Sequence, residues 1–111
     1  MALALGGNLG PVESTFREAL RQLEAVLGPL RVAPLYRTAA VSPIPQLDYL
    51  NTAAVGATAL PPHEVLALAK RLEQAAGRRP GPRFGPRPLD IDLLLWGDLI
   101  LPDPELTLPH P

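Results

Sequence analysis

The chain has 111 residues, 47% of them hydrophobic, which is enough for one compact domain and argues against disorder. Its formal net charge of -1 excludes a general attraction to nucleic acid or anionic membranes, so any basic site must come from local clustering. The chain has no cysteine, which excludes disulfides and thiolate metal sites, and no apolar run long enough to cross a bilayer. The first residues contain no leader-like pattern, so we expect a cytoplasmic protein.

The first half of the chain predicts a strand, a helix and two more strands. An apolar run at residues 2–5 ends in a glycine-rich turn, and Pro11 is well placed to begin a helix that ends at Gly28. The apolar stripe of that helix has helical spacing: Phe16, Leu20, Leu23 and Leu27. Residues 30–38 predict a second strand, with Pro34 indicating an edge or a bulge, and residues 49–58 predict a third after an irregular segment.

The second half predicts a helix, a strand and a hairpin-like tail. The buried face of the helix is expected to carry Val65, Leu66, Ala69, Leu72 and Ala76, and Gly77 to end it. Residues 78–88 have no periodicity, residues 89–96 predict a strand, and residues 99–111 form the proline-rich tail. This order of elements predicts a single α+β domain with helices packed on a mainly antiparallel sheet.

The most informative segment is the predicted strand that carries Asp90 and Asp92. Strand side chains alternate between faces, so the two carboxylates share one face about 6.6 Å apart, while Leu89, Ile91, Leu93 and Leu95 are expected to face a core. Carboxylates this close favour a cation between them, and Mg²⁺ suits such a pair because it fills its other positions with water and phosphate. An exposed aspartate beside one that caps a turn remains the alternative.

A cluster of arginines precedes these aspartates. Arg78, Arg79, Arg83 and Arg87 lie within ten residues that contain no acidic side chain, and guanidinium groups bind phosphate oxygens in pairs. A solvated basic loop is the alternative for such a cluster taken alone. Its position before two aspartates favours a polyphosphate with Mg²⁺, the combination that phosphoryl transfer needs. The sequence has no G-x-x-x-x-G-K-[ST] motif, which argues against a P-loop nucleotidase.

Motifs along the whole chain resemble those of the 6-hydroxymethyl-7,8-dihydropterin pyrophosphokinase family, in the same order. Residues 5–10, L-G-G-N-L-G, are similar to the family's L-G-S-N-[LM]-G, with Gly7 in place of serine. Residues 36–38 and 48–51 resemble its Y-x-T and [DQ]-[FY]-x-N block. Residues 73–92 resemble its E-x-x-x-G-R and [WF]-x-P-R-x-[IL]-D-[IL]-D signature, and residues 106–111 match L-x-[IVL]-P-H-P.

The resemblance implies a ferredoxin-like fold and transfer of pyrophosphate from ATP to the hydroxymethyl group of the pterin, releasing AMP. Asp90 and Asp92 would hold two Mg²⁺ ions. The arginines expected to handle phosphate are Arg78, Arg83 and Arg87. Glu73, Phe84, Thr107 and His110 would line the nucleotide side together with those arginines. The pterin would be bounded by Thr38, Val41, Tyr49 and Asn51.

The family pattern continues past the last motif with an arginine and an aromatic residue that would close the site and stack on the pterin. We therefore expect residues 1–111 to be the larger part of the family's domain, acting as a monomer on small molecules. A ferredoxin-like module that binds nucleotide without catalysis remains an alternative. A nucleic-acid-binding domain is disfavoured by the net charge and by an aromatic content of 5%.

Overall fold

The computed structural model describes residues 1–39, 46–77 and 86–111. Its elements are, in chain order, β1 (Ala2–Gly7), α1 (Val12–Leu27), β2 (Leu30–Val32), β3 (Tyr36–Thr38), β4 (Tyr49–Gly56), α2 (Pro62–Ala75), β5 (Asp90–Leu95), β6 (Leu101–Pro102) and β7 (Thr107–Leu108).

The main sheet has β1 and β4 at its centre, and every strand pair in it is antiparallel. Strand β5 pairs with β1, while β2 and β3 both pair with β4 on its other side. If β2 and β3 are taken as one interrupted strand, the chain runs strand, helix, strand, strand, helix, strand. The predicted α+β, ferredoxin-like fold is therefore confirmed.

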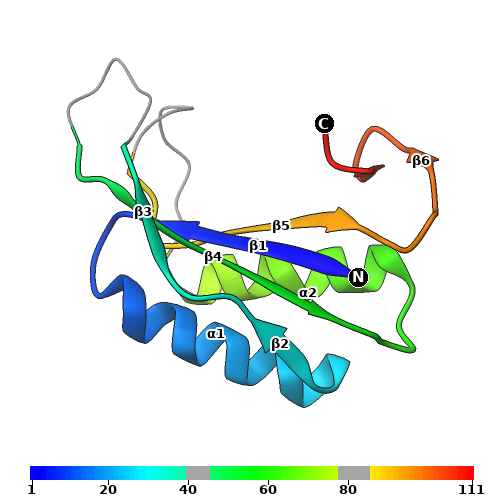
Figure 1. Ribbon diagram of the computed structural model, residues 1–111, viewed down its shortest axis with the longest axis horizontal. Coiled ribbons are helices and arrows are strands. Elements are labelled where there is room, and N and C mark those ends of the chain that lie inside the picture. Colours follow the sequence, from blue (N-terminus) through cyan, green and yellow to red (C-terminus); the bar gives the residue numbers. More distant parts are fainter. Residues whose placement is uncertain (40–45, 78–85) are drawn as a thin grey trace.

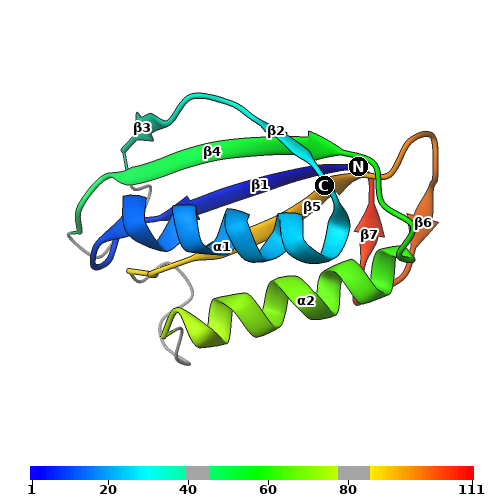
Figure 2. The same cartoon turned by 90° about the horizontal axis from the view of Figure 1, so that it is seen from below.

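Both helices lie on one face of the sheet, side by side (Figures 1 and 2). Alternate residues of the inner strands, such as Leu3 and Leu5 of β1, point into the core between the sheet and the helices. The helices contribute their apolar stripes to that core: Val12, Phe16, Ala19, Leu23 and Leu27 from α1, and Val65, Leu68, Ala69 and Leu72 from α2. The opposite face of the sheet, called the outer face below, has no helix packed on it among the described residues.

The predicted helix stripes need two corrections, both in α2. Leu20, expected in the apolar stripe of α1, is partly buried and packs against the core as predicted. Leu66 is also partly buried, because the buried positions of α2 follow residues 65, 68, 69 and 72 and place Leu66 to one side. Ala76, expected on the buried face of the helix, lies beyond its last residue and packs against the core at its edge.

The second predicted strand is divided in two around Pro34. The amide of Ala33 donates a hydrogen bond to the carbonyl of Ala53 at 2.8 Å, which continues the pairing beyond β2. Proline has no N–H to continue the ladder, and pairing with β4 resumes only at Tyr36. The strand expected at residues 49–58 ends at Gly56, two residues early.

The expectation that Leu95 faces the core is wrong. Leu93 pairs with Leu3, but Leu95 pairs with Ala2, so one residue is inserted in β5. This β-bulge reverses the alternation of faces. Leu95 consequently lies on the outer face with 48% of its surface exposed, whereas Leu89, Ile91 and Leu93 are buried as expected.

The tail forms a short hairpin, as predicted, in which Leu101 pairs with Leu108 and Pro102 with Thr107. Leu106 and Leu108 are buried and attach this hairpin to the main core. The amide of His110 then donates to the carbonyl of Leu94 at 2.9 Å, which holds the tail beside β5.

Candidate functional site

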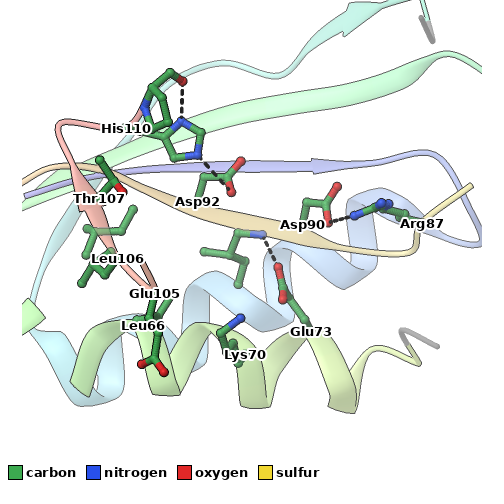
Figure 3. Close-up of a pocket in the computed structure, with 13 residues that line it drawn as sticks. Leu66, Lys70, Glu73, Arg87, Asp90, Asp92, Glu105, Leu106, Thr107 and His110 are labelled. Carbon is green, nitrogen blue, oxygen red and sulfur yellow. Dashed lines mark hydrogen bonds and ion pairs between the residues drawn. The ribbon is translucent and has the colours of Figure 1, made fainter. Parts of the chain in front are cut away.

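Asp90 and Asp92 lie on the outer face of β5, as strand alternation predicts. Asp90 pairs with Gly6 and Asp92 with Ala4, while Ile91 between them is buried in the core. The two side chains are 28% and 54% exposed. Both carboxylates are therefore held by a rigid strand and remain accessible to a ligand, side by side in Figure 3.

A cationic or titratable group stands near each carboxylate. Arg87 Nη1 lies 3.4 Å from Asp90 Oδ1, and His110 Nε2 lies 3.7 Å from Asp92 Oδ1. These separations are longer than a strong charge-assisted hydrogen bond. Arg87 and His110 thus place a positive and a titratable group beside the two aspartates, next to the position that a ligand carrying metal and phosphate could take.

A cavity of about 460 Å³ runs along the open edge of β5, next to these carboxylates. Its walls come from α2, from β5 and from the tail hairpin: Leu66, Lys70, Glu73, Arg87, Asp90, Ile91, Asp92, Leu93, Glu105, Leu106, Thr107, His110 and Pro111. Volumes of this order are typical of small-molecule sites. Six of the residues expected from the sequence to bind the nucleotide or its metal line this cavity, namely Glu73, Arg87, Asp90, Asp92, Thr107 and His110.

Glu73 reaches from α2 to the edge of β5. Its Oε2 accepts a hydrogen bond from the amide of Ile91 at 2.8 Å (Figure 3). An amide on the open edge of a sheet has no neighbouring strand to bind, so this contact satisfies it. Glu73 therefore also anchors the strand that carries the aspartates to the helix behind it.

Asp103 holds together the turn of the tail hairpin, which forms one wall of the cavity. Its Oδ1 accepts the Glu105 amide at 3.0 Å, and its carbonyl accepts the Thr107 hydroxyl at 3.1 Å. His63 Nε2 lies 3.0 Å from the other carboxylate oxygen. The Glu105 amide, and secondarily His63, hold the pKa of Asp103 below its usual value. This network fixes the turn that presents Thr107 to the cavity.

Thr38, Tyr49 and Asn51 gather on the outer face at the other side of β1. Thr38 pairs with Tyr49 across β3 and β4, and Asn51 Nδ2 donates to Thr38 Oγ1 at 2.9 Å. Asn51 is paired with Gly6, which is itself paired with Asp90. The strands of Asn51 and Asp90 are thus two sheet spacings apart, about 10 Å.

Gly6 itself adds no side chain to the surface between Asn51 and Asp90. A Cβ placed on Gly6 would lie 3.4 Å from Asn51 Oδ1 and 4.0 Å from the Tyr49 ring. A flat group could consequently lie on the backbone of β1 with an amide on one side and a carboxylate on the other. The structure thus brings the two predicted halves of the site onto one surface.

Several expected site residues lie outside the described residues: Val41, Arg78, Arg79, Arg83 and Phe84. Conversely, sequence reasoning missed Lys70, Glu105 and Leu66 of the cavity wall. Lys70 stands three residues before Glu73, and Leu66 stands four residues before Lys70. Residues at this spacing lie on the same side of a helix, so the expected role of Glu73 could have identified Lys70 and Leu66 as further residues of the cavity wall. Glu105 had no comparable signal, because its position depends on the turn made by Asp103.

The donor set at Asp90 and Asp92 fits Mg²⁺ that arrives with a polyphosphate. No group of three or more acidic or histidine side chains able to hold a metal occurs in the described part of the chain. Mg²⁺ commonly uses one or two carboxylates together with substrate phosphates and water, so two adjacent aspartates suffice. In residues 1–39, 46–77 and 86–111, no helix has the length and apolarity of a membrane span.

Comparison with known proteins adds an independent finding. The family model described as 7,8-dihydro-6-hydroxymethylpterin-pyrophosphokinase matches residues 2–111. A protein of Arabidopsis thaliana named "Folate synthesis bifunctional protein, mitochondrial" is 41% identical over 111 residues, which cover 99% of this chain and 20% of that protein.

Two bacterial relatives carry the name "2-amino-4-hydroxy-6-hydroxymethyldihydropteridine pyrophosphokinase". The one from Synechocystis sp. is 40% identical over 98% of this chain and 56% of its own length. The one from Aquifex aeolicus is 34% identical over 98% of this chain and 68% of its own length. The chain thus spans about a fifth of the plant protein and between half and just over two thirds of these bacterial ones.

Proposed function

This chain belongs to the 7,8-dihydro-6-hydroxymethylpterin-pyrophosphokinase family, and on that premise we propose that it transfers pyrophosphate from ATP to 6-hydroxymethyl-7,8-dihydropterin in folate biosynthesis. The observation that carries the proposal is the shared outer face of Asn51, Gly6 and Asp90. Two substrates must meet for this reaction, and on that face the backbone of Gly6 separates the aspartates from the side chain of Asn51.

The nucleotide is assigned to the cavity at the open edge of β5. Arg87 and His110 would neutralise phosphate charge, while Glu73 and Thr107 would border the remainder of the nucleotide. Arg78, Arg83 and Phe84 would complete this side. Asp90 and Asp92 would hold two Mg²⁺ ions, which when bound supply positive charge to the polyphosphate.

The pterin is assigned to the surface formed by Thr38, Tyr49 and Asn51, with Val41 at its border. The Asn51 amide carries both a donor and an acceptor, which suits the polar edge of a pterin ring. Its present bond to Thr38 keeps the amide group oriented toward the outer face. Gly6 would lie under the ring.

The reaction forms one bond and breaks one. The hydroxymethyl oxygen of the pterin attacks the β-phosphorus of ATP, the bond from that phosphorus to the α-phosphate oxygen breaks, and AMP leaves. The hydroxyl proton is released. Catalysis of this kind depends mostly on placing the two reactants in line and on neutralising charge, which is what the residues on both sides of Gly6 would do.

The setting of the domain belongs to the same proposal. We expect residues 1–111 to act as one domain, as a monomer and in the cytoplasm, with two Mg²⁺ ions for each ATP. The Arabidopsis relative is named mitochondrial, so the compartment differs among members of the family.

Titration calorimetry with a non-hydrolysable ATP analogue and with the pterin tests this assignment. We predict that nucleotide binding requires Mg²⁺ and that each ligand still binds when the other is saturating. Mutual exclusion of the two ligands would contradict the proposal, because it would place them in one pocket. Binding of nucleotide alone, with no pterin binding, would favour a nucleotide-binding module.

A further inference from the structure

Asn8, just beyond the end of β1, is a polar side chain that is almost fully buried, with 4% of its surface exposed. Its side-chain amide and its backbone N–H form hydrogen bonds with two other segments of the chain. Its Nδ2 donates to Gln46 Oε1 at 2.6 Å and to the Leu47 carbonyl at 2.9 Å. Its Oδ1 accepts the Arg87 amide at 2.9 Å, and its own amide donates to the Arg87 carbonyl at 2.9 Å.

These two segments lead directly to the two sides of the proposed site. Gln46 and Leu47 precede β4, which carries Tyr49 and Asn51, while Arg87 precedes β5, which carries Asp90. The sheet ladder itself ends at Gly7, so it does not fix what lies beyond. The side chain of Asn8 extends the connection past the end of the sheet, on both sides of β1.

The neighbouring Gly7 shows how closely the end of β1 approaches the segment before β5. A Cβ on Gly7 would lie 2.5 Å from the Pro88 carbonyl oxygen, well inside van der Waals contact. In this chain, the absence of a Cβ at Gly7 allows the end of β1 to approach the start of β5 this closely. Gly7 therefore has a structural role at the end of the sheet.

We propose that Asn8 is a positioning residue, which sets the pterin side of the site at a fixed distance from the phosphate side. The inference rests on the proposed function, because it concerns how the two substrates are aligned. Misplacing reactants by about 1 Å can cost on the order of 100-fold in rate, so a single buried amide that holds both sides can matter without touching either substrate.

Two substitutions of Asn8 distinguish its bonds to the segment before β4 from its bonds to the segment before β5. Asn8→Ala removes all three side-chain hydrogen bonds. Asn8→Asp keeps an acceptor for the Arg87 amide but places a carboxylate oxygen 2.9 Å from the Leu47 carbonyl, which has no proton to offer. The Asp variant should therefore release the segment before β4 while holding the segment before β5.

A third substitution, Leu23→Val, controls for stability. Leu23 is fully buried in α1 and does not line the cavity. Loss of a buried methylene lowers the stability of the fold without touching the contacts of Asn8. A reduced folded fraction lowers the apparent kcat and leaves KM unchanged, so KM distinguishes positioning from stability.

The test combines steady-state kinetics with amide hydrogen exchange on the wild type and the three variants. We expect Asn8→Ala to raise both substrate KM values, to lower kcat at least about tenfold, and to speed exchange at residues 46–51 and 87–92. Asn8→Asp should raise KM for the pterin, keep KM for ATP near the wild-type value, and leave the Arg87 amide protected. Leu23→Val should change neither KM.

Kinetics of Asn8→Ala that match those of Leu23→Val would overturn the proposal, as would faster exchange in only one of the two segments. Exchange needs no turnover. A wild-type protein that produced no AMP would therefore refute the proposed function, while the connection made by Asn8 would still be decided by exchange alone.

Discussion

At the scale of single residues, Gly6 determines what can bind on the outer face, because glycine has no side chain to occupy that surface. Its neighbours in the sheet, Asn51 and Asp90, both carry polar groups on that face. A glycine inside a strand is usually unfavourable, and such a position often marks a site where a ligand approaches the backbone. Gly6 therefore belongs with the proposed pterin surface although it has no chemistry of its own.

Gly6→Val should block that surface. The added methyl groups would extend from a Cβ already 3.4 Å from Asn51 Oδ1, into the space assigned to the pterin. Valine favours strands, so the fold should be retained. We predict that KM for the pterin rises at least about tenfold while nucleotide affinity is little changed, by analogy with the cost of misplacing a reactant. Ala2→Val, at the other end of the same face, is the matched control, and wild-type pterin binding by Gly6→Val would disprove the assignment.

Asp92→Asn tests the proposed metal site. An amide removes one negative charge while keeping the shape, and since Asp92 is 54% exposed the fold should be unaffected. We predict that turnover falls on the order of 100-fold or more, as when a catalytic electrostatic group is lost, and that nucleotide binding loses its dependence on Mg²⁺. Asp98→Asn, in the exposed turn after β5, should behave as wild type. Near-normal turnover by Asp92→Asn would rule out the metal-binding role.

Residue-level prediction from sequence worked where alternation alone decides the outcome. The shared face of Asp90 and Asp92 follows from the two-residue period of a strand, which β5 obeys from Asp90 to Leu93. It failed at Leu95, because the bulge that turns this residue outward depends on the register with β1. The burial of Asn8 and its hydrogen bonds could not be predicted either, because its partners lie 38 to 79 residues away along the chain.

At the scale of elements, the attachment of β5 to α2 determines where the aspartates stand. Among the described residues, strand β5 pairs with β1 alone, and the bond from the Ile91 amide to Glu73 supports its other edge. The tail supports the same edge at the Leu94 carbonyl. Glu73 and His110 also line the cavity, so the elements that stabilise this edge of the sheet are the ones that form the proposed nucleotide side.

Glu73→Ala should therefore affect stability as well as nucleotide binding. Losing a hydrogen bond to a charged acceptor typically costs about 1.5–3 kcal/mol. Glu73→Gln keeps a carbonyl oxygen for the Ile91 amide, so we expect most of that stability to be retained. Urea denaturation of the two variants measures the difference. Equal stability of Glu73→Ala and the wild type would show that the bond does not support β5.

The ends of helices and strands could be predicted where a nearby glycine or proline determines them. Gly28 ends α1 with a φ of 101°, a conformation that glycine adopts readily, and the tail hairpin follows its prolines. Pro34 was identified as a disturbance, but the sequence did not show whether the strand would bulge or separate into β2 and β3. That choice depends on the tertiary pairing of Ala33 and Tyr36 with β4.

At the scale of the whole molecule, the two helices cover one face of the sheet and leave the outer face to the site (Figure 1). The order of strands and helices was enough to predict this arrangement, because short connections and antiparallel neighbours allow few alternatives. The sequence also placed Asn51 and Asp90 in separate motifs, 39 residues apart. Only the order of the strands, with β1 between β4 and β5, shows that they face each other across Gly6.

The central claim is that this chain binds ATP at the edge of β5 and a hydroxymethyl-dihydropterin on the adjoining outer face, and transfers pyrophosphate between them. Product analysis after incubation with ATP, Mg²⁺ and 6-hydroxymethyl-7,8-dihydropterin tests it most directly. The account predicts AMP and a pterin carrying two phosphates in equal amounts, with neither formed when the pterin or Mg²⁺ is omitted. Formation of ADP with a singly phosphorylated pterin, or no AMP from a folded protein that binds both ligands, would contradict it.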